Sequence, residues 1–89
     1  MNQEHFVTEL VEVVRDRFLD PTSADQLTAQ TPLLEWGILT SMNTAILLNH
    51  IRETYGIQVP PQHITGKNLA TIEALAALLS SLDRTEVSA

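Results

Sequence analysis

Near the start of the chain, apolar side chains recur every three or four positions, which is the spacing of one face of an α-helix. The apolar stripe consists of Phe6, Val7, Leu10, Val14 and Phe18, with Glu4, Thr8, Glu12 and Arg15 opposite. Asn2 is suited to cap this helix, and Asp20-Pro21 is expected to end it because proline cannot continue a helix. The pattern predicts an amphipathic helix over residues 3–19.

Two further stretches have the helical pattern. In residues 41–55 each position turns by about 100°, so Thr44, Leu47, Leu48, Ile51 and Tyr55 share one face, and Met42, Ile46, Asn49 and Glu53 share the other. Gly56 is expected to end this helix, because glycine readily adopts the left-handed conformation of a helix C-terminus. A last helix is predicted over residues 71–82, capped by Thr71, with Ile72, Leu75, Leu78, Leu79 and Leu82 facing inward.

The remaining segments are predicted to be connections. Residues 20–40 are rich in Thr, Ser, Asp, Gln and Pro and predict a long loop, a feature that is usually functional. Its apolar residues, Leu27, Leu33, Leu34, Trp36, Ile38 and Leu39, are expected to hold it against the helices. Residues 57–59 predict an extended stretch, and residues 62–65 predict a short helical turn ended by Gly66. No alternating strand pattern is visible.

These elements predict an all-α fold: a small four-helix bundle with three main helices, one short helix and a long first loop. The chain has 89 residues, 44% of them apolar, which suits one small domain rather than a disordered segment. We expect residues 1–83 to form that domain and residues 84–89 to be a disordered tail. Aromatic residues are scarce, so Leu, Val, Ile and Ala must build the core.

Charge and composition limit the function classes. Eleven acidic and five basic residues give a net charge of −6, which disfavours nucleic acid and anionic membranes as partners. The absence of cysteine excludes disulfides, Cys-based metal sites and thiol catalysis. No signal peptide and no apolar run of membrane-spanning length are visible, so we expect a cytoplasmic protein.

The segment Gly37-Ile38-Leu39-Thr40-Ser41-Met42 places one serine at the start of an apolar helix. A serine in this position faces solvent and is held by a rigid element, which suits a modification site better than a core position. Thr40 stands where the helix needs an N-cap, a role that threonine and aspartate both perform.

The chain resembles the acyl and peptidyl carrier proteins, whose signature is Gly-x-Asp-Ser-Leu. The resemblance extends from Phe6 to Leu82. It is carried by Thr31-Pro32-Leu33, by the segment from Gly37 to Met42, by Tyr55-Gly56-Ile57-Gln58-Val59-Pro60 and by Thr71-Ile72. Here Thr40 and Met42 replace the usual Asp and Leu.

The resemblance implies a carrier without catalytic residues, on which Ser41 bears a covalent 4'-phosphopantetheine arm from coenzyme A. It implies three kinds of partner: a phosphopantetheinyl transferase, an acyl- or aminoacyl-loading enzyme, and downstream synthases or transferases. The carrier is expected to be a monomer. Because the chain begins with its own methionine, we expect a discrete carrier. Fatty acyl, polyketide, amino acid and β-amino acid cargoes all fit the same arm.

Fatty acid carriers usually have acidic residues along the outward face of the helix that follows the serine. Here Asn43 and Ile46 stand there, and only Glu53 is acidic. This favours a carrier of specialised metabolism, such as polyketide, nonribosomal peptide or antibiotic biosynthesis, that meets its partners through apolar contact. The predicted docking residues are Leu39, Thr40, Met42, Ala45, Ile46 and Asn49. The alternative for Met42 and Ile46 is that the loop from Leu33 to Leu39 covers them.

Other chemistries fit less well. A hydrolase serine needs a base within hydrogen-bond reach, but His50 lies about 180° around the same helix from Ser41. No Gly-x-Ser-x-Gly elbow and no metal-ligand spacing is present. The remaining alternative is a helical protein–protein interaction module that is never modified, because serine is also a common helix cap.

Overall fold

The structure is a computed structural model that describes residues 2–20, 22 and 26–88. Over these residues, α1 spans Gln3–Phe18, α3 spans Ser41–Tyr55, α4 spans Gly66–Leu69 and α5 spans Ile72–Ser88. A short 3-10 helix, η1, spans Pro61–His63. The described part of the chain contains no strand, so the all-α prediction is confirmed.

Three helix ends lie where the sequence predicts: the starts of α1 and α5 and the end of α3. Asn2 accepts a backbone hydrogen bond of 2.9 Å from the first turn of α1, and Thr71 accepts one of 3.0 Å from the first turn of α5. Gly56 ends α3 in the left-handed conformation, with φ 69°. These caps satisfy backbone groups that the helix itself leaves without partners. Pro21, which was predicted to end the first helix, lies outside the described residues.

The core lies between α1, α3 and α5. Its fully or nearly fully buried helical residues are Phe6, Leu10, Val14, Leu47, Ile51, Ile72, Leu75, Ala76 and Leu79. Burial of each large aliphatic or aromatic side chain contributes about 1.5–3 kcal/mol, so this cluster holds the bundle together. The predicted inward faces of all three main helices are therefore confirmed.

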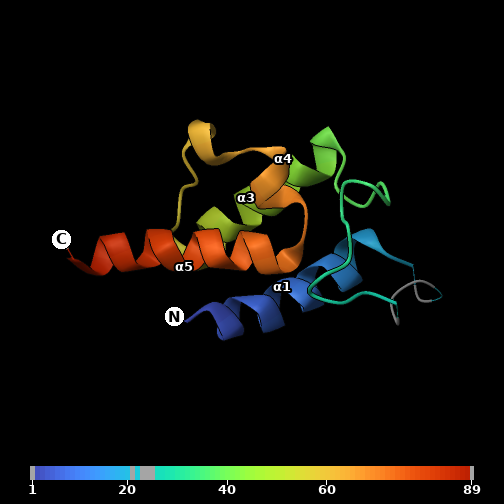
Figure 1. Cartoon of the computed structure of the whole chain (residues 1–89), viewed down its shortest axis with the longest axis horizontal. Helices are drawn as coiled ribbons and strands as arrows, with labels where there is room; N and C mark the ends of the chain where they lie inside the picture. Colours follow the sequence, from blue (N-terminus) through green and yellow to red (C-terminus); the bar gives the residue numbers. More distant parts are fainter. Residues whose placement is uncertain (1, 21, 23–25, 89) are drawn as a thin grey trace.

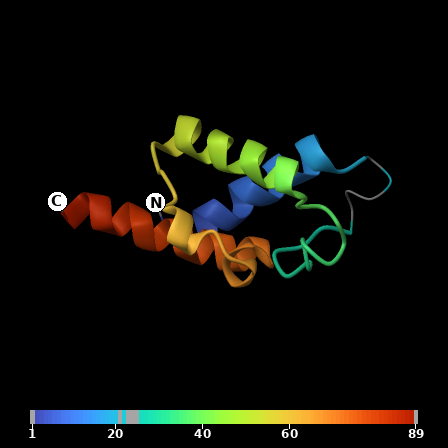
Figure 2. The same cartoon turned by 90° about the horizontal axis from the view of Figure 1, so that it is seen from above.

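Residues 26–40, which lead into α3, lie at the end of the bundle opposite the chain termini (Figures 1 and 2). This part of the connection between α1 and α3 is anchored to the segment that joins α4 to α5. The backbone N–H of Leu33 donates to the carbonyl of Ala70 at 2.8 Å, and the N–H of Glu73 donates to the carbonyl of Ala29 at 3.0 Å. Because the chain then passes directly into α3, these bonds also fix the place where α3 begins.

Three sequence expectations need correction. Leu34 and Trp36 do not anchor the connection, because they are 42% and 55% exposed, whereas the other apolar residues of the loop are buried. Gly66 begins α4 rather than ending a helix, because Thr65 caps α4 with a 3.3 Å hydrogen bond. The last helix continues beyond Leu82, its predicted end, to Ser88.

Tyr55, at the end of α3, contacts α1 in two ways. Its ring lies edge-on to Phe6, with centroids 5.3 Å apart and planes at 83°. Its hydroxyl donates to the Glu9 carboxylate, which also contacts His5 at 2.8 Å. The Tyr55 hydrogen bond lowers the pKa of Glu9 below its ordinary value of 4.5, and burial with the Glu9 contact raises the pKa of Tyr55. Both shifts favour the pairing of a charged carboxylate with a neutral phenol.

Removing the Tyr55 hydroxyl therefore has a pH-dependent effect. A carboxyl group with a depressed pKa stabilises the fold above its unfolded pKa, and this contribution disappears as the pH falls through the folded value. We expect Tyr55→Phe to cost about 1 kcal/mol at pH 7, the usual contribution of one hydrogen bond, because the Glu9 carboxylate is partly exposed to solvent and the ring is kept. Denaturant unfolding at pH 7 and near pH 3 should show this loss shrinking in acid. A loss of equal size at both pH values would contradict the role of ionised Glu9.

Candidate functional site

The turn before α3 combines a left-handed glycine with two buried side chains. Gly37 has φ +74°, which glycine adopts without the strain that other residues meet. Ile38 and Leu39 follow with only 6% and 4% of their surface exposed. Their backbone N–H groups both donate to the carbonyl of Leu33, at 2.9 and 3.1 Å. The turn is thus held by the core on one side and by the connection on the other.

Thr40 and Asn43 fix the first turn of α3. Thr40 lies outside the helix at φ −85° and ψ 177°, and its Oγ1 accepts the backbone N–H of Asn43 at 3.1 Å. The side-chain Nδ2 of Asn43 reaches back to donate to the carbonyl of Ile38 at 2.8 Å. The predicted cap is confirmed. The sequence did not predict the Asn43 contact, because it depends on the path of the preceding turn.

Ser41 is the first residue of α3 and is exposed to solvent. Its hydroxyl forms no hydrogen bond with another described residue. The first turn of α3 contains no acidic side chain, and a helix N-terminus carries a partial positive charge. The site therefore offers an accessible oxygen nucleophile where a negatively charged phosphate group is favoured.

The family model described as "Phosphopantetheine attachment site" matches residues 8–79, which is most of the chain and includes this serine. The chain belongs to the phosphopantetheine carrier family. This carrier is 31% identical over 75 residues to the probable acyl carrier protein PigG of Serratia sp. (strain ATCC 39006). That match covers 84% of this chain and 85% of PigG.

A solved structure is also similar to the carrier. One chain in a crystal structure described as that of an FAD-dependent dehydrogenase superposes with a TM-score of 0.74 at 37% sequence identity. The match covers 80% of this chain and 99% of that chain. The predicted carrier family and the acyl-carrier-like helical fold are therefore confirmed.

The cofactor of the carrier is 4'-phosphopantetheine, as the family membership establishes. The start of α3 fits this group. The exposed Ser41 side chain would provide an oxygen for a phosphodiester bond, and the helix N-terminus would favour the remaining phosphate charge. The cofactor would supply a flexible arm that ends in a thiol, which the chain lacks because it contains no cysteine.

The predicted docking residues, at the start and on the outward face of α3, are exposed with one exception. Met42 is 72% exposed and Ile46 is 39% exposed, so the loop does not cover them. Thr40, Ala45 and Asn49 are also exposed. Leu39 is the exception: its side chain is buried in the core, so the prediction that it docks a partner is wrong. We refer to Met42, Ala45, Ile46 and Asn49 together as the outer strip.

Beside the outer strip lies a groove of about 280 Å³, between the last turn of α1 and the outer face of α3. It is lined by Arg17, Ala45, Ile46, Asn49, His50 and Glu53. Sequence analysis did not include Arg17, because nothing in its local pattern indicates which part of α3 it approaches. Asn49 Oδ1 accepts a hydrogen bond of 2.8 Å from Nη2 of Arg52, which lies one turn further along α3.

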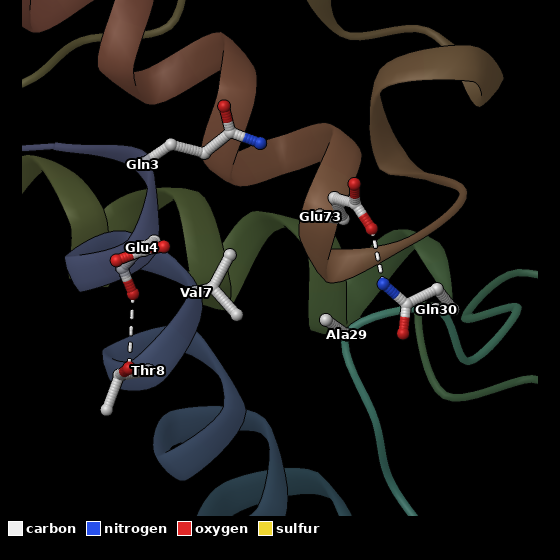
Figure 3. A pocket seen from close by; sticks show the side chains of 7 residues that line it. All are labelled: Gln3, Glu4, Val7, Thr8, Ala29, Gln30 and Glu73. Atoms are coloured by element: carbon white, nitrogen blue, oxygen red, sulfur yellow. Dashed lines mark hydrogen bonds between the residues drawn. The ribbon is translucent and has the colours of Figure 1, made fainter.

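A second hollow, of about 630 Å³, lies away from these residues, among the start of α1, Ala29-Gln30 and the start of α5 (Figure 3). Two acidic residues, Glu4 and Glu73, line it. Gln30 donates to the Glu73 carboxylate, and the Thr8 hydroxyl donates to the Glu4 carbonyl at 3.1 Å. Ser41 and the outer strip do not contribute to this hollow.

The described residues do not form the other kinds of site that the sequence raises. In the part of the chain that the structure describes, no three His, Asp or Glu residues are grouped so that they could hold a metal ion. His50, which a serine hydrolase would need near Ser41, instead lies 3.4 Å from the Thr54 hydroxyl. Among the described helices, none combines the length and the hydropathy required to cross a bilayer.

The cap at Thr40 can be tested through stability. We expect Thr40→Ala to destabilise the carrier by about 1 kcal/mol, the usual cost of deleting a cap. Thr40→Asp should stay within about 1 kcal/mol of wild type, because aspartate accepts the same hydrogen bond. It should also accelerate modification by transferases adapted to the usual aspartate. Thr54→Ala, on the exposed side of the same helix, is the control. Chemical denaturation measures all three, and equal stabilities for wild type and Thr40→Ala would refute the cap.

Proposed function

We propose that this chain carries acyl or aminoacyl groups as thioesters on a 4'-phosphopantetheine arm attached to Ser41. The observation that carries the proposal is an exposed serine at the start of a capped helix in a chain of the carrier family. In the modification, Ser41 Oγ attacks a phosphorus of coenzyme A and displaces adenosine 3',5'-bisphosphate. A separate transferase supplies magnesium and the base that takes the serine proton. The carrier itself positions the arm and makes no bonds.

We place the carrier in polyketide, nonribosomal peptide or related specialised biosynthesis. Its α3 has no acidic residue in the first turn, and Met42 and Ile46 expose apolar surface beside the attachment point. An exposed apolar surface of this kind favours docking by partner proteins. Partners would meet the outer strip mainly through apolar contact rather than through a row of basic side chains. Its partners would be the transferase, a loading enzyme and the downstream enzymes.

The similar solved structure supports a flavin dehydrogenase as one of those downstream enzymes. The match spans 99% of the other chain but only 80% of this one. The other chain is therefore shorter than 89 residues. A dinucleotide-binding fold needs two βαβαβ halves, which a short helical chain cannot contain. We therefore take the matched chain to be a carrier that accompanies the dehydrogenase. Such an enzyme would remove two electrons and two protons from the tethered group, which FAD takes up as FADH2.

Covalent modification tests the attachment site directly. Because the chain contains no cysteine, the unmodified protein should not react with a thiol-specific dye. After incubation with a broad-specificity phosphopantetheinyl transferase, magnesium and coenzyme A, one thiol per chain should be labelled. Ser41→Ala should abolish the label, and Ser80→Ala should keep it. Intact mass measures the same event.

Two results would count against this assignment. A label that persists in Ser41→Ala would place the arm on another residue. A wild-type chain that remains unmodified with every transferase tried would favour the unmodified interaction module.

The outer strip makes a separate prediction about docking. Ile46→Glu should change the free energy of unfolding by no more than about 0.5 kcal/mol, as for a typical surface substitution. It should slow thioester loading by the cognate enzyme, because the new charge meets an apolar surface without a partner. Gln58→Glu, an exposed substitution after α3, is the control. Thermal melting measures the change in stability, and loading rates at two salt concentrations measure docking. An unchanged loading rate would show that Ile46 does not contact the loading enzyme.

A further inference from the structure

The groove beside α3 differs from the rest of the molecule in its charge. The chain has a net charge of −6, but Glu53 is the only acidic residue among those that line the groove. Arg17 enters it from the last turn of α1, where its side chain is exposed. Arg17 forms no ion pair with another described residue. Within the described part of the chain, the Arg17 guanidinium thus lies next to the apolar surface of the outer strip without an ion-pair partner.

A second hydrogen-bond donor lies in the same groove. Arg52 can only donate, so its 2.8 Å contact identifies the Asn49 oxygen as the acceptor. The amide nitrogen of Asn49 then keeps its two N–H donors for other partners. Together with Arg17 it gives the groove donors that suit a carboxylate, next to apolar surface from Ala45 and Ile46.

The volume of the groove indicates what kind of occupant fits. Pockets that enclose small molecules usually measure about 300–1,000 Å³. At about 280 Å³, and with an exposed wall on α3, this groove is smaller. It suits one or two side chains of a docked protein better than a free metabolite.

We propose that this groove receives an apolar side chain and a neighbouring carboxylate from the enzyme that acts on the tethered cargo, and that Arg17 determines the specificity of this contact by pairing with the carboxylate. This inference rests on the proposed carrier function and names a contact outside α3. The apolar side chain would cover Ile46, and the carboxylate would bridge Arg17 and the Asn49 amide. An oppositely charged pair at the edge of an interface acts mainly on the rate of association and on its salt dependence.

Two neighbouring arginines make a matched comparison. Arg15 and Arg17 both lie exposed in the last turn of α1, but about 200° apart around the helix. Only Arg17 lines the groove. Arg15→Glu and Arg17→Glu therefore change the net charge and the helix terminus equally, and differ only in which side of α1 is altered. Arg17→Lys keeps the charge as a third variant.

The test measures binding of each phosphopantetheinylated carrier to the FAD-dependent dehydrogenase of the similar crystal structure, by titration calorimetry at low and high salt. We expect Arg17→Glu to weaken binding by about tenfold at low salt, and less at high salt. Arg15→Glu should stay within about twofold of wild type, and Arg17→Lys should retain most of the affinity. Thermal melting should be the same for the two glutamate variants.

The outcomes separate this inference from the proposed function. Thiol labelling of the same samples reports whether the carrier is modified at all, independently of the groove. Equal losses for Arg15→Glu and Arg17→Glu would overturn the role of Arg17 while leaving the carrier function intact. A modified wild-type carrier that does not bind the dehydrogenase would also overturn it. Dimerisation of wild type that Arg17→Glu abolishes, seen by analytical ultracentrifugation, would show that a second copy occupies the groove instead.

Discussion

The placement of Ser41 depends on the burial of Ile38 and Leu39 immediately before α3. These two side chains hold the turn in the core, so the next residues must leave it in a fixed direction. Thr40 then ends the turn and caps the helix, and Ser41 emerges into solvent as the first helical residue. Without the buried pair, the same cap would sit on a loop free to move. The exposed serine is therefore a consequence of what is buried next to it.

The connection between α1 and α3 is part of the same construction. Its backbone bonds to Ala70 and from Glu73 fasten it to the junction of α4 and α5. As a result, the position of the turn before α3 depends on hydrogen bonds to residues that are about 40 positions away in the sequence. A loop of this length would otherwise be free to open locally, because exposed loops have low local stability. The anchoring explains how a small bundle fixes the direction in which α3, and with it Ser41, begins.

One face of α3 packs into the core, and the opposite face is exposed to solvent. Leu47 and Ile51 enter the core, and Tyr55 fastens the end of the helix to α1 through Phe6 and Glu9. Met42 and Ile46 point away from this packing and do not belong to the core. A face that is not needed for folding can vary with the partner that it meets. The position of Arg17 extends the same surface onto α1, because the last turn of that helix passes beside α3.

The sequence alone determined the main helices, their inward faces and their caps, because these depend on periodicity and on single residues such as Asn2, Thr40 and Gly56. It also determined that Ser41 begins a helix. It did not determine which residues of the connection are buried: Leu39 and Trp36 are both apolar, yet one enters the core and the other faces solvent. Nor could it place Arg17 beside Ile46 or Asn43 against Ile38. Those contacts join separate elements or span an irregular turn, so only the packing of the helices and the path of the chain between them decided them.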